Sequence, residues 1–225
     1  MSLKETLNNN KYKILLYLSG FIILGFSVNL LKASGLGSGA WDTVTINGRD
    51  FLNINLGLSW VTLGMISFLV SFLLMIIVLS YRRRLKYLFM IIPIFLVSLS
   101  IDFWNLLVFK DTQVIGIVYQ ILLFIIGAII LPMGLTLVVK SSFPAFVFDE
   151  LMLMLVEVFK AKKITFVRLG IEFTGILIGA IFGYITYFKL NGTLGVVNIG
   201  SFVLAFTLAP IMTVYFKIFK VNKNE

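Results

Sequence analysis

Six long apolar segments recur along the chain, separated by short polar stretches. They cover residues 12–31, 57–79, 87–107, 114–139, 165–188 and 194–216. Each is close to the roughly 20 residues that a helix needs to cross a bilayer. The pattern therefore predicts an all-α polytopic membrane protein, with six transmembrane helices in a single membrane domain.

Two of the intervening segments differ from free loops: residues 33–56 are too polar to cross lipid and too apolar for a free loop, and residues 141–163 include a strongly apolar stretch with acids at its start. The first predicts a short helix from about Trp41 to Leu52, and the second a short helix that starts near Phe148. Irregular backbone survives at membrane depth only where protein or a water-filled cavity surrounds it. We therefore expect each short helix to be re-entrant or to lie in the membrane interface.

A glycine-rich run, residues 35–42, leads into the first short helix. Three glycines in five residues, Gly37 and Gly39 among them, favour positive φ angles and close backbone approach. Trp41 and Asp42 follow, with no obvious cation beside the carboxylate. Asp42 is then either a helix N-cap or a group that binds ligand or carries protons, and the two roles are compatible.

The same segment recurs 107 positions later. Aligned without gaps, Gly20–Asp42 and Gly127–Asp149 are identical at 7 of 23 positions. The most informative pairs are the non-aliphatic ones. They are the identities Gly20/Gly127, Ser34/Ser141 and Asp42/Asp149, and the aromatic pair Trp41/Phe148. We therefore predict two three-helix repeats, over residues 12–107 and 114–216.

Basic residues alternate between the two sides of the predicted membrane domain. With a cytoplasmic N-terminus, 15 of the 19 lysines and arginines fall on the cytoplasmic side. This bias predicts a multi-pass protein of the bacterial cytoplasmic (plasma) membrane with both termini in the cytoplasm. The two repeats then have opposite orientations, and the net charge of +9 needs no nucleic-acid partner.

Composition restricts the chemistry. The chain is 60% hydrophobic and 13% charged, with a mean hydropathy of +1.04, and it contains neither cysteine nor histidine. Thiol nucleophiles are therefore excluded, and zinc sites, haem ligation and histidine-assisted catalysis lose their usual ligands or base. We expect no enzyme, no cofactor and no metal site.

Three further acids are candidates for a substrate-binding or proton-coupling role. Asp149 and Glu150 open the second short helix, and Glu172 lies about two turns into the fifth span. Glu172 is four residues from Arg168, a spacing that favours an ion pair within the helix. Arg49 and Asp50 are expected to be interfacial and solvated.

The chain resembles the bacterial YczE/YitT-type integral membrane proteins. The matching features are the G-L-G-x-x-x-W-D run from Gly35 to Asp42, the short polar helix after it, and the Asn191-Gly192-Thr193 turn before the last span. The likeness covers most of the chain. It implies the architecture and carries no substrate or activity.

Inverted repeats with re-entrant elements are common in secondary transporters, so the leading hypothesis is a small permease or substrate-binding membrane protein of unknown substrate. The alternatives are a substrate-capture subunit of a multicomponent transporter and a non-transport accessory or assembly protein. The expected partners are the lipid bilayer, a small molecule, and either a second copy of the chain or another membrane protein. The acids favour a cation, whereas free helix N-termini favour an anion, and the sequence does not choose between them.

Overall fold

The computed structural model describes residues 3–144 and 146–221, which form helices and connecting segments without a strand in these ranges. In chain order the elements are α1 (Leu3–Ser34), α2 (Ala40–Asn55), α3 (Leu63–Arg82), the 3₁₀ turn η1 (Leu85–Met90), α4 (Ile91–Trp104), the π-helical turn η2 (Asn105–Phe109), α5 (Ile117–Lys140), α6 (Val147–Val158), α7 (Ile164–Asn191) and α8 (Ile199–Ile218).

Six stretches of helix are long and apolar enough to cross a membrane. They are Asn10–Ser34, Leu63–Arg82, Leu85–Phe109, Ile117–Lys140, Ile164–Asn191 and Ile199–Ile218. The predicted all-α class and the six spans are thereby confirmed, and the protein is an integral membrane protein. The short helices α2 and α6 fall in the two segments for which they were predicted.

The starts of two spans differ most from the hydropathy prediction, and both lie later in the chain. The second begins at Leu63 because Gly57 turns the backbone at φ +70° and the Thr62 hydroxyl caps the first turn of α3. The last begins at Ile199, where the Asn198 side chain accepts a hydrogen bond from the first N–H of α8. Local capping chemistry sets these boundaries, and an apolar window cannot detect it.

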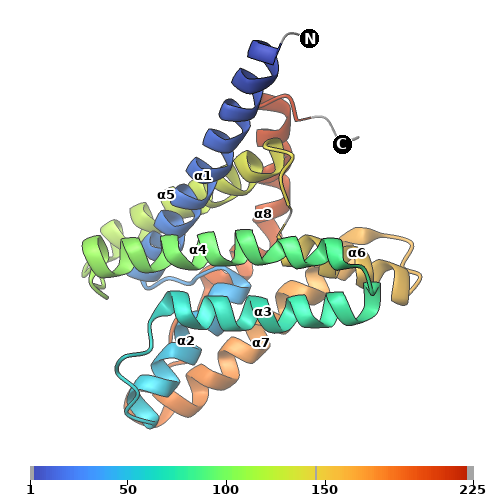
Figure 1. The fold of residues 1–225 in the computed structure, drawn as a ribbon. Helices are drawn as coiled ribbons and strands as arrows, with labels where there is room; N and C mark the ends of the chain where they lie inside the picture. The colour runs from blue at the N-terminus through green and yellow to red at the C-terminus, as the bar shows by residue number, and fades with distance from the viewer. Residues whose placement is uncertain (1–2, 145, 222–225) are drawn as a thin grey trace.

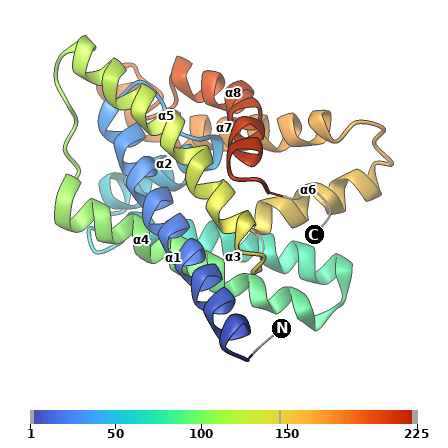
Figure 2. The ribbon, with the colours of Figure 1, turned by 90° about the horizontal axis from the view of Figure 1, so that it is seen from above.

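Helices α1 and α5 lie side by side (Figures 1 and 2). The two helices pack antiparallel, with Gly20 against Val138 and Gly127 against Leu31. The absent side chains of the two glycines allow this close approach. Helix α4 packs on α1, and helix α8 packs on α5.

The two short helices pack on the remaining spans. Helix α2 lies along α7, and the contacts of Ala40 with Gly175 and of Thr43 with Gly179 show that the two run parallel. Helix α6 packs between α3 and α7.

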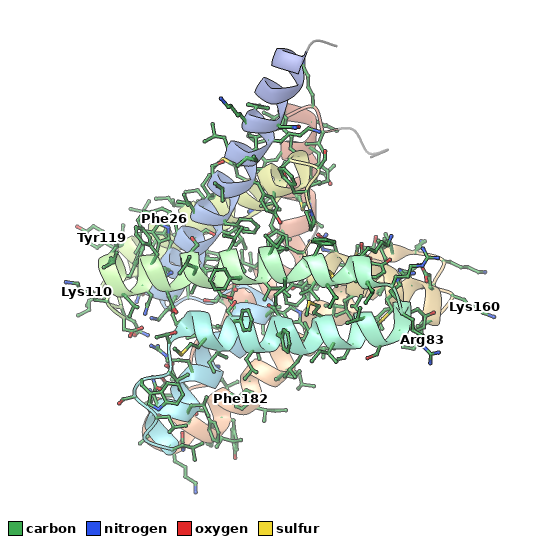
Figure 3. All side chains as sticks on the ribbon, in the orientation of Figure 1. Phe26, Arg83, Lys110, Tyr119, Lys160 and Phe182 are labelled. Atoms are coloured by element: carbon green, nitrogen blue, oxygen red, sulfur yellow. The ribbon has the colours of Figure 1, made fainter. Side chains whose placement is uncertain are left out.

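The molecule has two chemically different ends (Figure 3). The basic end carries Arg82–Arg84 and Lys160–Lys163. The opposite end, here the network end, carries the connection from Lys110 to Gly116 between η2 and α5. Helix α2 runs towards the network end, where Arg49 meets Asp111, and α6 runs towards the basic end, where Glu157 meets Arg82.

Candidate functional site

The two short helices meet at their N-termini. The rings of Trp41 in α2 and Phe148 in α6 have centroids 5.1 Å apart with an interplanar angle of 43°. From this contact the helices diverge, α2 towards the network end and α6 towards the basic end. Both therefore begin inside the bundle. Helix α2 is largely buried as far as Arg49, whereas α6 has an exposed side that includes Leu153 and Val158.

A central cavity of about 170 Å³ lies where the two helices meet. Side chains from all eight α-helices line it, among them Leu24 and Val28 near the middle of α1. The polar and aromatic lining residues are Trp41, Asp42, Ser67, Ser71, Phe146, Phe148, Asp149, Arg168 and Glu172. The site thus lies inside the helix bundle, where ionisable groups are rare and mark candidate functional sites.

Most of the candidate residues from the sequence come together here. Trp41, Asp42, Asp149 and Glu172 line the cavity together with Gly39. Glu150 does not line it, although its charge lies within electrostatic reach of Arg82 and Asp149. The turn from α5 into α6 points the first of the two adjacent acids inward and the second away from the cavity.

Gly37 and Gly39 matter for different reasons. Gly37 has φ +135° and packs against the backbone of Gly200 and Ser201 at the start of α8, so it needs both the unusual conformation and the absent side chain. Gly39 has an ordinary φ of −54°, which corrects the expectation of special backbone freedom there. A side chain at Gly39 would collide with the Asp42 carboxylate.

Asp42 has the geometry of a helix cap as well as that of a site residue. It is the third residue of α2, and its carboxylate lies beside Gly39, the N-cap. An acid in the first turn complements the positive end of the helix dipole. The carboxylate also faces the cavity. Both roles left open by the sequence are therefore compatible with the structure.

The charges of the cavity are unevenly matched. Arg168 lies within electrostatic reach of Asp149 and Glu172, while the charged neighbour of Asp42 is Glu172. The predicted ion pair between Arg168 and Glu172 does not form, because their charged atoms do not approach within 4.0 Å. Spacing of four residues allowed the pair, but both side chains turn towards the cavity and its other charges.

Sequence reasoning missed Ser67 and Ser71, which line the cavity from α3. They lie four and eight residues after the first residue of α3, and Arg168 and Glu172 hold the same places in α7. The shared i, i+4 spacing is a signal that the sequence contains. It was hidden because the gap-free alignment ends before these positions.

A second group of charges lies at the network end. Arg49 binds both carboxylate oxygens of Asp111 at 3.0 Å, and Lys32 pairs with the same carboxylate. Lys32 also donates to Asn105 Oδ1 at 2.8 Å. Arg49 pairs with Asp50 at 2.6 Å. These residues tie α1, α2, η2 and the connection before α5 together.

This network corrects the expectation for Arg49 and Asp50. Arg49 is 9% exposed, and the Asp50 carboxylate accepts a hydrogen bond from the Tyr187 hydroxyl at 2.7 Å. Burial alone would raise the pKa of Asp111, but the hydrogen bonds from Arg49 and Lys32 lower it to about 2. The network borders a polar pocket of about 780 Å³ at this end of the bundle.

The part of the chain that the structure describes contains no group of three His, Cys, Asp or Glu residues able to hold a metal ion. The chemistry available in the central cavity is therefore that of carboxylates, one guanidinium, two hydroxyls and three aromatic rings. Such a set can bind and orient a small molecule.

Comparison with known proteins gives relatives without an assigned activity. Residues 11–217 match a protein family described as a family of unknown function (DUF6198). The chain is 26% identical over 156 residues to the "Uncharacterized protein YyaS" of Bacillus subtilis (strain 168), which covers 69% of this chain and 74% of that protein. No solved structure matches the chain. Because the family match covers nearly the whole length, the chain belongs to this family of unknown function.

Proposed function

We propose that this protein is a small membrane permease whose substrate binds in the central cavity. The observation that carries the proposal is the meeting of two re-entrant helix N-termini, those of α2 and α6, across a cavity that contains ionisable side chains. Secondary transporters built from inverted repeats place their substrate sites at such a junction near the middle of the membrane.

The same hydrogen bonds and backbone turn occur at two positions 107 residues apart, which supports the prediction of two repeats. The Ser34 hydroxyl donates to a carbonyl three residues before it at 2.6 Å and accepts from the N–H two residues after it at 3.2 Å. Ser141 makes the same two bonds, at 2.6 and 3.3 Å. The next residues, Gly35 and Ser142, both have a left-handed backbone, with φ of +69° and +59°.

Tertiary contacts recur in the same way. A Cβ at Gly20 would lie 2.6 Å from Val138, and a Cβ at Gly127 would lie 2.8 Å from Leu31. The two contacts exchange when each residue is shifted by 107 positions. Packing partners follow the same rule, since α2 packs on α7 as α6 packs on α3, and α1 packs on α4 as α5 packs on α8.

The proposed orientation places the basic end in the cytoplasm of a bacterium and the network end outside. Arg82–Arg84 and Lys160–Lys163 all lie at the basic end (Figure 3), as the positive-inside rule requires of short cytoplasmic loops. Two of the basic residues expected outside, Lys32 and Arg49, are neutralised by carboxylates. The resemblance to YczE/YitT-type proteins is part of the same proposal.

The test labels a single introduced thiol and therefore needs no substrate. The chain has no native cysteine that would react in its place. Ser71→Cys places one thiol in the central cavity, and membrane-impermeant thiol reagents are applied to vesicles of each orientation. A permease exposes its site alternately to the two sides, so we expect Ser71→Cys to react from both. Reaction from one side alone would contradict the proposal and favour a static accessory protein.

Three control thiols make the result interpretable. Asn55→Cys and Lys162→Cys lie at the two ends and should react from opposite sides. Ser27→Cys replaces a fully buried hydroxyl that is not part of the cavity lining, so it should react from neither. Reaction of both end thiols from the same side would overturn the proposed topology.

A further inference from the structure

The charge of the central cavity is negative when all its groups are ionised. Three carboxylates, those of Asp42, Asp149 and Glu172, share the cavity with one guanidinium, that of Arg168. Arg168 lies within reach of Asp149 and Glu172, so these three partly neutralise one another. Asp42 has no such cation near it among the described residues. Its carboxylate is therefore the least compensated charge in the cavity.

The two helix N-termini do not offer a free anion site. Each contributes roughly half a positive charge and several unpaired N–H groups, which by themselves would favour an anion. Each already has a carboxylate of its own at the third helical position, Asp42 in α2 and Asp149 in α6. The Asp42 carboxylate also lies beside Gly39, the N-cap of α2. An anion that entered the cavity would meet full negative charges in front of two partial positive ones.

The other walls favour an organic ligand over a bare metal ion. Trp41, Phe146 and Phe148 line the cavity, and an aromatic face attracts an ammonium or guanidinium group within about 6 Å. Most of the remaining lining is aliphatic, and calcium would require about six to eight oxygen ligands. At about 170 Å³ the cavity is smaller than the roughly 300–1,000 Å³ typical of sites for drug-sized ligands.

We infer that the substrate is a small organic monocation, such as an alkylammonium ion, bound between the Asp42 carboxylate and the ring of Trp41. This inference rests on the proposed permease function and adds its substrate class. Glu172 supports Asp42 from α7, while Arg168 neutralises Asp149. Of the two equivalent carboxylates, Asp42 thus binds the ligand and Asp149 interacts with Arg168.

Tryptophan fluorescence provides the test, because Trp41 lies at the site. With Trp60 and Trp104 replaced by Phe, Trp41 is the single reporter in purified protein. Methylammonium, ethylammonium and tetramethylammonium chlorides are titrated against sodium chloride, sodium acetate and sodium phosphate at equal ionic strength. We expect a saturable change with at least one organic cation and none with the sodium salts.

Matched variants connect the signal to the site. Asp42→Asn should weaken cation binding at least tenfold, whereas Glu150→Gln, which removes an acid outside the cavity lining, should leave it unchanged. Asp42→Glu should retain part of the binding. If Asp42→Asn does not yield folded protein, Glu172→Gln should show a loss of binding that Glu150→Gln does not.

The outcomes separate the two proposals. A saturable response to acetate or phosphate, a cation response that Asp42→Asn leaves unchanged, or no response to any cation would each overturn the cation assignment. If Ser71→Cys still reacts from both sides of the membrane in that case, the permease proposal stands without it. If that thiol reacts from one side alone, the permease proposal fails, regardless of the fluorescence response to the cations.

Discussion

The two short helices each follow a long span, α2 after α1 and α6 after α5, yet they are held by different forces. Helix α2 is clamped by Asn47, which bonds to Gly179 O at 2.8 Å, to Leu194 O at 3.0 Å and to Val196 N at 3.1 Å. Glycines of α7 let its backbone approach closely. Helix α6 makes mainly apolar contacts, through Val147, Leu151 and Met154.

This difference bears on which helix can move. Directional hydrogen bonds and interlocked glycines define a single position for α2, because displacement would leave buried polar groups unpaired. Apolar contacts are non-directional, and those of α6 include the adaptable side chains of Met75, Met90 and Met154. We therefore expect α6 to be the mobile element of the proposed permease and α2 the fixed one.

The largest effect is expected at Asn47. Asn47→Ala leaves the N–H of Val196 without its partner and removes one bond from each of two carbonyls at a fully buried position, a loss of roughly 2–4 kcal/mol of stability. The control, Asn53→Ala, removes one long bond of 3.5 Å to Val61 and should cost under about 1 kcal/mol. Thermal unfolding in detergent compares them, and equal losses would show that Asn47 does not clamp α2.

The glycine contacts give the next test. A methyl group at Gly179 would collide with Thr43, whereas a methyl group at Gly170 of the same helix meets nothing within 4 Å. Gly179→Ala should destabilise the protein by about 1–3 kcal/mol through overpacking. Gly170→Ala should be neutral or stabilise it by up to about 1 kcal/mol through helix propensity. If both variants melt together, α2 and α7 are not closely packed.

The ion pairs at the two ends should differ more modestly. Asp111→Asn leaves the buried cations Lys32 and Arg49 less compensated and should cost about 1–2 kcal/mol, less than a fully buried pair because Asp111 is half exposed. Glu157→Gln breaks the pair of Arg82 with a half-exposed acid and should cost under about 1 kcal/mol. Thermal unfolding at neutral pH measures both, and a larger loss for Glu157→Gln would contradict the comparison.

The pH dependence at Asp111 has a definite sign. Its pKa is lowered in the folded protein to about 2, from about 3.9 in an unfolded chain. The stabilisation by Asp111 is therefore fully present above about pH 4 and is lost as the pH falls towards 2. Acid titration of stability should show this loss in the native protein. An equal loss over that window in Asp111→Asn would place its origin elsewhere.

The sequence predicted the spans and paired Asp42 with Asp149, because both depend on local pattern, but it did not predict that the two acids share one cavity. Hydropathy located the six long helices, and the aligned pair Asp42 and Asp149 proved to share one cavity. Trp41 and Phe148, also aligned, are in ring contact. Features that recur at a fixed offset can be read without knowing the fold.

The rest depended on contacts between distant segments. Asp111 lies 79 residues from Lys32 and 62 from Arg49, and no local spacing relates them. Asn47 was one of several asparagines in a polar stretch, and its partners lie more than 130 residues away. Helix packing decides such pairs, so composition placed Arg49 in solvent although the structure buries it.

The most direct measurement of the central claim is a crosslink between the starts of α2 and α6. Trp41→Cys and Phe148→Cys, combined in the otherwise cysteine-free chain, replace two rings whose centroids lie 5.1 Å apart. In native membranes we expect mild oxidation or a short bifunctional thiol reagent to join the two positions, and thiols at Asn55 and Lys162 to react from opposite sides. Failure to crosslink, with both cysteines still reactive and the protein folded, would show that the helices do not meet and would contradict the proposed site.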